Sequence, residues 1–296
     1  MAHLITLITP KSKKAISDEL ILKIKQVIGE NFMAAVWLAE NEAMDIILHD
    51  ELPAGIQTKI LSLISPLPID YAFHTDDNRR KKLLIADMDS TMIGQECIDE
   101  LADFVGIREK ISEITERAMN GELEFNAALT ERVGLLKGMP RSALQAAFDE
   151  KITLNQGART LVQTMKTNGA YTALVSGGFT FFTEQVQNQT GFDTTRANTL
   201  NFIDDKLDGT VGEPILGQQA KLDSMNEFCN LRNIELDDAL AVGDGANDLA
   251  MVTKAGLGIA YHAKPIVAAQ AKVAINHCDL TALLYIQGYK AEEFIH

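Results

Sequence analysis

Residues 83–93 read LLIADMDSTMI, and this stretch decides the fold. Four apolar residues predict a short buried strand, which ends in two aspartates, Asp87 and Asp89, followed at once by Ser90 and Thr91. Open parallel sheets place their chemistry at the carboxyl ends of strands, so the pattern predicts a site at this end. Two carboxylates this close repel one another, and both ionise only beside a cation. A bound metal or a retained proton satisfies that condition, whereas an acidic turn capped by Ser and Thr is the structural alternative.

Two further apolar runs end in the same way. Residues 171–178 read YTALVSGG and residues 238–249 read DALAVGDGANDL, with an isolated Lys221 between them in GQQAKLDSMNEF. Because the carboxyl ends of parallel strands meet at one edge, three such endings predict a single assembled site. The residues at the second and third ends are Ser176, Gly177, Asp244, Asn247 and Asp248.

The order DMDST, LVSGG, an isolated Lys and GDGAND resembles all four motifs of the haloacid dehalogenase superfamily. Within the superfamily, the chain is most similar to the phosphoserine phosphatase family. Glu96, in IGQECIDEL, and Arg132, in ALTERVGLL, match the substrate-binding cap residues of that family. The resemblance covers about residues 80–290, and its motifs are specific in combination although each is weak alone.

The resemblance implies an α/β fold. The expected core is a doubly wound parallel sheet, assigned to residues 79–296, with a helical cap inserted at about 94–155. Residues 1–78 are expected to form a separate ferredoxin-like α+β unit that resembles small-molecule-sensing ACT modules. Its first strand-to-helix loop, TPKSKK, lacks the glycine that lets ligand approach the backbone in such modules. Sensing and a structural or dimerising role therefore both remain open.

For the reaction, the resemblance implies Mg²⁺-dependent hydrolysis of O-phosphoserine, the last step of serine biosynthesis. Asp87 would attack phosphorus to give an aspartyl-phosphate, and Asp89 would act as general acid and then base. A lysine replaces this second aspartate in transport ATPases, so Asp89 favours a phosphatase. Magnesium would bind the Asp87 carboxylate, the Asp89 backbone carbonyl and Asp244.

Other residues are expected to assist this chemistry. Ser176, the Gly177 N–H and Lys221 would bind the phosphoryl oxygens, provided that Lys221 is buried. Asp248 and Asn247 would orient the metal shell, although a helix N-terminal acid stabilised by the macrodipole is the alternative for Asp248. Phosphoserine also carries an ammonium and a carboxylate. Glu96 and Arg132 supply the opposite charges, which does not by itself distinguish phosphoserine from phosphothreonine.

Composition limits the partners. The chain has 296 residues and a formal net charge of −14, which disfavours nucleic acid and anionic membranes as partners. Cys97, Cys229 and Cys278 are scattered without metal-ligand spacing, which is typical of reduced, buried thiols in a cytoplasmic protein. The first residues lack the charge order of a secretory signal. A small-molecule substrate is expected, and a homodimer is compatible with the sequence.

Local patterns complete the prediction. Residues 1–75 show a βαββαβ order with Ser17 opening the first helix, and HTDDNRRKK is predicted to be a polar linker. The cap reads as helices ending near Gly106, Gly121 and Gly138, with Phe125, Leu129, Val133 and Leu136 as an internal packing stripe. A hairpin in NFIDDKLDGTV is expected to turn at Asp208-Gly209.

Three alternative functions remain. Another small-metabolite phosphatase or phosphotransferase of the same superfamily would share the motifs. An amino-acid-binding regulator would rely on the N-terminal unit. A signalling receiver also uses aspartates and a lysine on a doubly wound sheet, but it would lack DMDST and the inserted cap.

Overall fold

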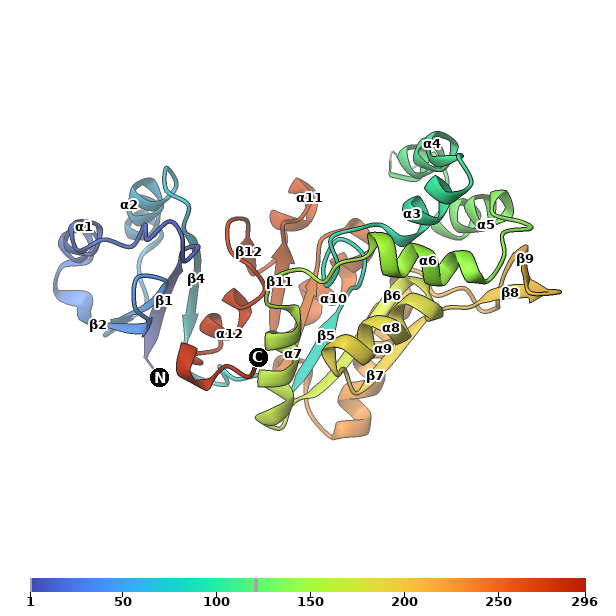
Figure 1. The fold of residues 1–296 in the computed structure, drawn as a ribbon. Coiled ribbons are helices and arrows are strands. Elements are labelled where there is room, and N and C mark those ends of the chain that lie inside the picture. Colours follow the sequence, from blue (N-terminus) through green and yellow to red (C-terminus); the bar gives the residue numbers. More distant parts are fainter. Residues whose placement is uncertain (1, 120–121) are drawn as a thin grey trace.

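The computed structural model describes residues 2–119 and 122–296. Figure 1 shows the N-terminal unit, the central sheet and the cap side by side, with the cap helices on the far side of the molecule from the N-terminus. The part of the chain that is described contains no helix of the length and apolar character needed to cross a membrane.

The N-terminal unit has the expected βαββαβ order. Its antiparallel sheet has the strand order β2-β3-β1-β4, which is the ferredoxin-like arrangement. The Ser17 side chain accepts a hydrogen bond from the Leu20 N–H and so caps the first helix, as predicted. Asn41 takes a positive φ of 61° in the turn between β2 and β3. The elements are β1 His3–Ile8, α1 Asp18–Ile28, β2 Phe32–Ala39, β3 Ala43–Leu48, α2 Ala54–Ile64 and β4 Asp70–Thr75.

The two faces of this sheet pack differently. Ile5, Leu7 and Ile46 point toward α1 and α2 and form a core that belongs to the unit alone. On the opposite face, Ile8 and Ala72 join the hydrophobic core of the rest of the chain. Strand residues alternate between the faces, so the sequence of β1 supplies apolar side chains to both. The N-terminal unit is therefore docked on the remainder of the protein through its sheet.

Arg79 does not behave as part of the predicted polar linker, because its side chain is not solvated but connects the N-terminal unit to the rest of the protein. Its guanidinium donates to both carboxylate oxygens of Asp45 in β3, at 2.6 and 2.8 Å, and its Nε donates to the Ile286 carbonyl at 2.8 Å. Its side chain is only 15% exposed. Asp70 makes a second connection by accepting the backbone N–H groups of residues 276–278. Contacts so distant in sequence leave no local signal in the composition of a linker.

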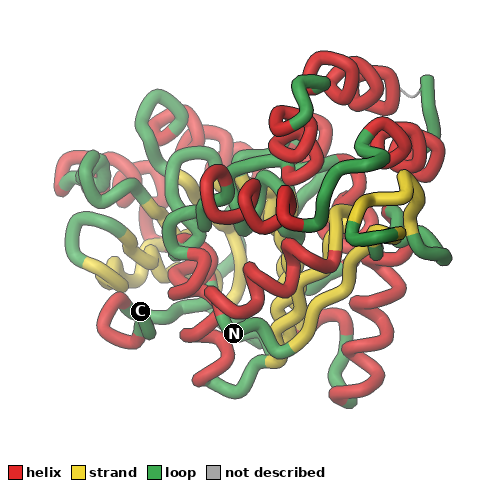
Figure 2. The backbone as a smooth tube through the Cα atoms, turned by 45° about the vertical axis from the view of Figure 1, so that its right-hand side comes forward, coloured by secondary structure: helices red, strands yellow, loops and turns green. Residues whose placement is uncertain are grey.

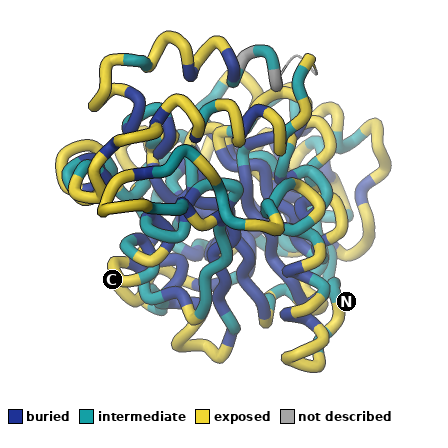
Figure 3. Tube along the Cα trace, turned by 90° about the vertical axis from the view of Figure 1, so that its right-hand side faces the viewer, coloured by how far each residue is buried: buried dark blue, intermediate teal, exposed yellow. Residues whose placement is uncertain are grey.

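The central sheet has six parallel strands in the order β12-β11-β10-β5-β6-β7, as expected for a doubly wound core. Leu83 and Ile85 of β5 face α9 and α10, whereas Leu84 and Ala86 face α7, α8 and α12. Helices lie on both sides of the strands in Figure 2, and Figure 3 shows the buried segments gathered in the interior of the molecule. The strands are β5 Leu83–Ala86, β6 Tyr171–Phe179, β7 Thr194–Asn198, β10 Ala239–Gly243, β11 Leu257–Tyr261 and β12 Val273–Ile275. The helices are α7 Ala158–Thr167, α8 Thr180–Thr190, α9 Gln218–Arg232, α10 Leu249–Lys254, α11 Pro265–Ala268 and α12 Ala282–Ile286.

The helical cap lies between β5 and β6, as predicted. Gly106 and Gly138 have positive φ values of 70° and 88° after helices, whereas Gly121 lies outside the described residues. Leu129 and Val133 of the predicted stripe are buried in the cap, but Phe125 is only partly buried and projects toward the sheet. The cap helices are α3 Cys97–Phe104, α4 Arg108–Met119, α5 Phe125–Leu135 and α6 Ser142–Lys151.

The hairpin is present, but its predicted turn is wrong. Strands β8 Leu200–Ile203 and β9 Lys206–Val211 are joined by Asp204 and Asp205, both with positive φ, as a type I′ turn requires. Gly209 lies within β9 with a φ of 87°, at a register irregularity of the ladder. A Cβ there would lie 3.0 Å from the Lys137 Cβ, so glycine permits a close approach to the cap. Asp208 and Gly209 therefore lie in a β-bulge within β9 and do not form the turn of the hairpin.

Candidate active site

Strand β5 lies at the centre of the site. The chain leaves β5 toward β6 and β7 and returns to β10 on its other side, which makes the carboxyl end of β5 a topological switch point. Ala86 pairs with Val242 of β10 and with Leu174 of β6. The residues that follow these partners therefore continue in register, and the three motif ends meet at one edge as predicted.

Asp87, Lys221 and Asp248 form a buried ion cluster. The Lys221 ammonium lies 2.7 Å from Asp87 Oδ1 and 2.5 Å from Asp248 Oδ1, and the lysine side chain is 2% exposed. The Met88 N–H also donates to Asp87 Oδ1, at 2.8 Å. Lysine is rarely buried unless it is paired, so the burial on which its predicted role depends is present together with its partners.

The pKa values of both Asp87 and Lys221 are raised in this cluster, for different reasons. Burial raises the pKa of Asp87 well above its ordinary value, and the charge of Asp248 raises it further, although Lys221 opposes both effects. For Lys221, burial acts to lower the pKa, but the charges of Asp248 and Asp87 outweigh it and the pKa is raised. The lysine is therefore a permanent cation beside Asp87 at neutral pH.

Asp89 lies beside the first turn of the cap. Its Oδ1 accepts the Cys97 N–H at 2.8 Å, and its Oδ2 accepts the Ser176 hydroxyl at 3.3 Å. Burial raises its pKa, while the Cys97 N–H acts to lower it. A raised pKa keeps a carboxylic proton available at higher pH, which suits a general acid. A Cβ at Gly178 would lie 2.7 Å from Asp89 Oδ2, so this position needs glycine.

The acidic groups on this edge fit a divalent metal. Asp87, Asp244 and Asp248 offer carboxylate oxygens that lie within 4.8 Å of one another. Burial, followed by the charge of Asp248, raises the pKa of Asp244 to about 6, which indicates an excess of negative charge. Lys221 contacts the carboxylates of Asp87 and Asp248, and its charge and that of Lys264 only partly offset the negative charge around Asp244. Hard oxygen donors are the ligands that Mg²⁺ prefers.

Asp248 fixes the backbone that carries Asp244. Its Oδ2 accepts the N–H groups of Asp244 and Gly245, at 3.2 and 3.1 Å, and it is fully buried. A Cβ at Gly243 would lie 2.3 Å from the Asp248 Cγ. These contacts fit an orienting role. The alternative of an acid at a helix N-terminus is less suitable because Asp248 is followed only by the short α10.

Glu96 and Arg132 both belong to the cap, and both interact electrostatically with Asp89. Glu96 Oε1 accepts the Ser90 hydroxyl at 2.6 Å. Arg132 Nη1 donates to Thr115 Oγ1 at 3.2 Å, so α4 and α5 together position the guanidinium. Burial lowers the Arg132 pKa, whereas Asp99, Glu96 and Asp89 raise it through their charges, which places Arg132 within electrostatic reach of the site. The cap therefore presents both signs of charge to the sheet edge.

The pKa of Glu96 is high for a carboxyl group. Burial, and then the charge of Asp89, raise its pKa to about 7, while the Ser90 hydroxyl opposes this. The side chain is nevertheless exposed to solvent. Solvent screens part of the effect of burial and of the Asp89 charge, and the pKa of Glu96 stays above its ordinary value.

The remaining predicted residues lie as follows. Ser176 and Gly177 are within β6, which continues to Phe179, and α8 begins at Thr180. A Cβ at Gly177 would lie 2.9 Å from the Phe125 ring. This aromatic side chain thus forms a wall of the crevice and is not part of the cap interior. Asn247 is half-buried in the turn that also holds Asp248.

Several site residues were missed by sequence reasoning. The Thr91 hydroxyl donates to Asp244 Oδ1 at 3.1 Å, and the Cys97 N–H and Gly178 both contact Asp89. Thr91 and Gly178 lie inside the motifs DMDST and LVSGG, so these motifs could have identified them as site residues. Cys97 itself is buried, and burial raises its thiol pKa well above the ordinary value, which fits the predicted structural role.

Known proteins share this fold and these motifs. The sequence pattern of the haloacid dehalogenase-like hydrolases matches residues 84–253. The chain therefore belongs to the haloacid dehalogenase-like hydrolase family. Among its relatives is the phosphoserine phosphatase of Polaromonas sp. (strain JS666), which is 45% identical over 208 residues, 69% of this chain and 88% of that protein.

Solved structures extend the comparison to the whole chain. A haloacid dehalogenase family hydrolase from Salmonella enterica serovar Typhi aligns with a TM-score of 0.86 and 30% identity over 96% of this chain and 98% of that one. A phosphoserine phosphatase solved as a phospho-aspartyl intermediate analogue aligns with a TM-score of 0.65 and 39% identity over 70% of this chain and 98% of that one. The first match includes the N-terminal unit as well as the catalytic core.

Proposed function

We propose that this chain hydrolyses O-phosphoserine to serine and phosphate through an aspartyl-phosphate on Asp87, and so catalyses the last step of serine biosynthesis. The proposal is supported by the opposite charges of Glu96 and Arg132, both of which interact with Asp89, and by the hydrogen bond between Glu96 and Ser90 of the same motif. A phosphorylated amino acid needs a phosphate site and two oppositely charged groups beside it. Relatives named phosphoserine phosphatases support this choice of substrate.

In the first step, an Asp87 carboxylate oxygen forms a bond to phosphorus while the bond from phosphorus to the serine oxygen breaks. Asp89 donates its proton to the departing serine oxygen, which would otherwise leave as a poor alkoxide leaving group. The raised pKa of Asp89 supports this role. Ser176, on the opposite side of Asp89, donates to its Oδ2 and fixes its orientation.

In the second step, Asp89 accepts a proton from water, and the water oxygen attacks phosphorus. The bond between phosphorus and the Asp87 oxygen breaks, which releases phosphate and restores both carboxyl groups to their initial states. Lys221 stays protonated throughout and offsets negative charge beside Asp87. The Gly177 N–H lies in the same strand segment as Ser176 and is proposed to bind a phosphoryl oxygen.

Magnesium is part of the proposal. Asp87, Asp244 and the Asp89 backbone carbonyl would hold it, with Asn247 and Asp248 orienting the shell. When bound, it supplies positive charge that neutralises the phosphoryl oxygens and the clustered carboxylates. The proposal also includes a cytoplasmic location, which rests on the composition and the three free cysteines, and a homodimer, which sizing in solution tests.

A panel assay tests the substrate. We expect phosphate release from phosphoserine with Mg²⁺, loss of release with a chelator, and much weaker release from sugar phosphates, which lack the ammonium that Glu96 would hold. Equal turnover of sugar phosphates and phosphoserine would favour a general metabolite phosphatase instead.

A further inference from the structure

Strand β6 is irregular at the segment that carries the proposed phosphoryl ligands. It pairs with β7 at Val175 and again at Phe179, so that residues 176–178 lie opposite the single residue Ala197. A bulge of this kind leaves backbone groups without partners in the ladder. Backbone groups that are removed from water need a partner from elsewhere, so another part of the chain must hold this segment in place.

The side chain of Asn198, at the end of β7, supplies that partner. It is 2% exposed, and its Nδ2 donates to the Gly177 carbonyl at 2.9 Å and to the Leu216 carbonyl at 3.2 Å. The Leu216 N–H in turn donates to Asn198 Oδ1 at 2.7 Å. Both polar atoms of the side-chain amide are therefore bonded, and Asn198 acts as an additional peptide group between two backbone segments.

The two segments that Asn198 joins both lead to groups proposed to bind phosphate. Gly177 lies on the bulge of β6, and Leu216 lies two residues before the start of α9. Lys221, in the first turn of α9, reaches Asp87 at 2.7 Å. Asn198 therefore sets the distance between the bulge and the start of the helix that carries the lysine.

An aromatic side chain of the cap covers both segments. A Cβ at Gly177 would lie 2.9 Å from the Phe125 ring and 3.9 Å from the Leu216 carbonyl oxygen. A Cβ at Gly217 would lie 3.2 Å from the same ring. Glycine at both positions lets the two segments lie side by side beneath the ring, so the packing of Phe125 depends on the separation that Asn198 maintains.

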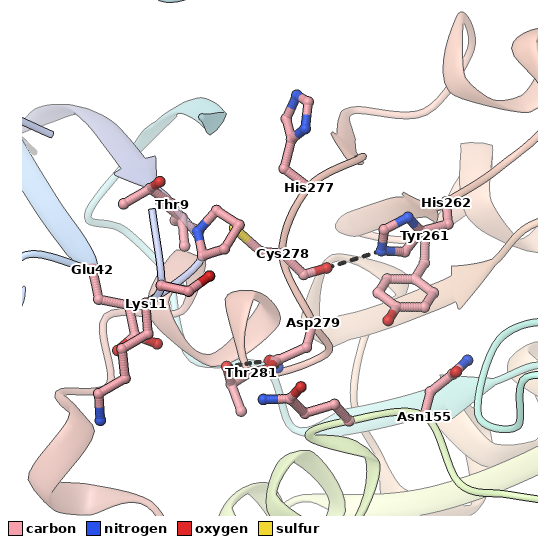
Figure 4. Close-up of a pocket in the computed structure, with 14 residues that line it drawn as sticks. Thr9, Lys11, Glu42, Asn155, Tyr261, His262, His277, Cys278, Asp279 and Thr281 are labelled. Atoms are coloured by element: carbon pink, nitrogen blue, oxygen red, sulfur yellow. Dashed lines mark hydrogen bonds between the residues drawn. The ribbon is translucent and has the colours of Figure 1, made fainter. Parts of the chain in front are cut away.

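Asn155 makes a related but different set of contacts. Figure 4 shows it among the residues that line a cavity of about 690 Å³ between the N-terminal unit and the central sheet. Its Nδ2 donates to the carbonyls of Thr91 and Ile93, at 2.8 and 3.2 Å. Asn155 therefore holds one short segment in shape, whereas Asn198 joins two segments that are distant in sequence.

We propose that Asn198 is a positioning residue for phosphoryl transfer, which holds the Gly177 bulge and the start of α9 at the separation that a phosphoryl group requires. The inference rests on the proposed function, in which Gly177 and Lys221 bind phosphoryl oxygens. Without the side-chain amide, the Gly177 carbonyl and both backbone groups of Leu216 lose this partner, and the two segments are free to separate. Asn198 acts through these backbone segments and not on the substrate itself.

The inhibition constant of orthovanadate, a mimic of the phosphoryl group in transfer, tests the proposal on the Mg²⁺-loaded enzyme. We expect Asn198→Ala to raise this constant and to lower kcat for an aryl phosphate by about tenfold or more, because misplacing binding groups by about 1 Å costs up to about a hundredfold in rate. The ratio of kcat/KM for phosphoserine to that for the aryl phosphate should stay unchanged, because one phosphate site serves both substrates. Asn198→Ser, whose hydroxyl can donate to only one of the two segments, should show a loss of the same kind.

Asn31→Ala is the matched control. Asn31 forms the same paired bonds with a backbone peptide, since its Nδ2 donates to the Asp50 carbonyl at 2.9 Å and its Oδ1 accepts the Asp50 N–H at 2.7 Å, but it lies in the N-terminal unit. Removing either asparagine should lower Tm, because each change leaves backbone groups without partners. Only the variants of Asn198 should change the orthovanadate constant.

An unchanged orthovanadate constant in a folded Asn198→Ala or Asn198→Ser enzyme would overturn the proposal. Failure of both variants to fold would also overturn it, since Asn198 would then be a purely structural residue. A loss confined to phosphoserine would assign the residue to substrate choice and contradict a role in positioning the phosphoryl group. Orthovanadate binding and aryl phosphate turnover do not require phosphoserine as the substrate, so failure of the proposed substrate would leave this test in force.

Discussion

Removal of the Lys221 ammonium is the most quantitative test of the buried charge cluster. Lys221→Met keeps an unbranched apolar side chain of similar length but leaves Asp87 and Asp248 without the cation that lies 2.7 and 2.5 Å from them. Removing one partner of a buried ion pair costs about 3–5 kcal/mol, because the remaining charge is unpaired and poorly solvated. We expect the free energy of unfolding near neutral pH to fall by this amount, measured by urea unfolding in the presence of a chelator.

Lys166→Met is the matched control. Lys166 pairs with Asp193 at a similar distance, 2.7 Å, but its side chain is 41% exposed. Exposed pairs contribute about 0–1 kcal/mol, so the two lysines should differ several-fold although their ion pairs look alike. The comparison separates burial from distance as the cause of the effect.

The loss in Lys221→Met should depend on pH with a definite sign. Burial and the Asp248 charge raise the Asp87 pKa above its ordinary value of 3.8, and the variant lacks the lysine charge that opposes them. A folded state with a raised pKa binds extra protons, so stability is lost as pH rises from the unfolded pKa through the folded one. The deficit should be small near pH 4 and grow toward neutrality. A loss below about 1 kcal/mol at neutral pH, or one that does not vary with pH, would refute the reasoning.

Three further predictions concern the site and the interface. Asp89→Asn should lower kcat for phosphoserine by about a hundredfold or more, with a smaller loss for aryl phosphates, since good leaving groups need less protonation; equal losses would contradict the general-acid role. The Glu96 pKa of about 7 predicts that KM for phosphoserine rises more steeply than KM for an aryl phosphate as pH falls below that value and Glu96 loses its charge. Arg132→Ala should likewise damage turnover of the amino-acid substrate more than that of the aryl phosphate. Arg79→Ala should lower the free energy of unfolding by about 3–5 kcal/mol, because its ion pair with Asp45 is largely buried. Arg80→Ala, which removes an exposed ion pair, should lower it by about 1 kcal/mol or less. Similar losses in the two variants would mean that Arg79 does not connect the N-terminal unit to the rest of the protein.

Much of the fold could be predicted because its signals are local. Strands β5, β6, β10, β11 and β12 of the central sheet are short apolar runs, whereas β7, with the sequence TTRAN, is not. The polar residues that end β5, β6 and β10 mark the edge where the site forms. The alternation of apolar residues in the N-terminal unit likewise predicts its βαββαβ order. Asp87 and Asp89 stand out in the sequence because acids are costly at the end of a buried strand unless they have partners.

The predictions that were wrong share one physical cause, which is contact between segments distant in sequence. Arg79 looked like part of a solvated linker, yet its partners Asp45 and Ile286 lie 34 and 207 residues away. Gly209 looked like a turn glycine, but the nearby cap residue Lys137 explains it. Phe125 had the spacing of a cap core residue, but its ring lies against Gly177 of the sheet. Local patterns indicate which side chains are unusual and do not indicate which distant segment they contact.

The central claim is that Asp87 carries the phosphoryl group during hydrolysis of phosphoserine. Turnover of radiolabelled phosphoserine, quenched rapidly in acid and followed by peptide mapping, tests it directly. We predict label on the peptide that contains residue 87, released by hydroxylamine as expected for an acyl phosphate, and no label or activity in a folded Asp87→Asn protein. Label on another residue, or full activity of Asp87→Asn, would contradict the account.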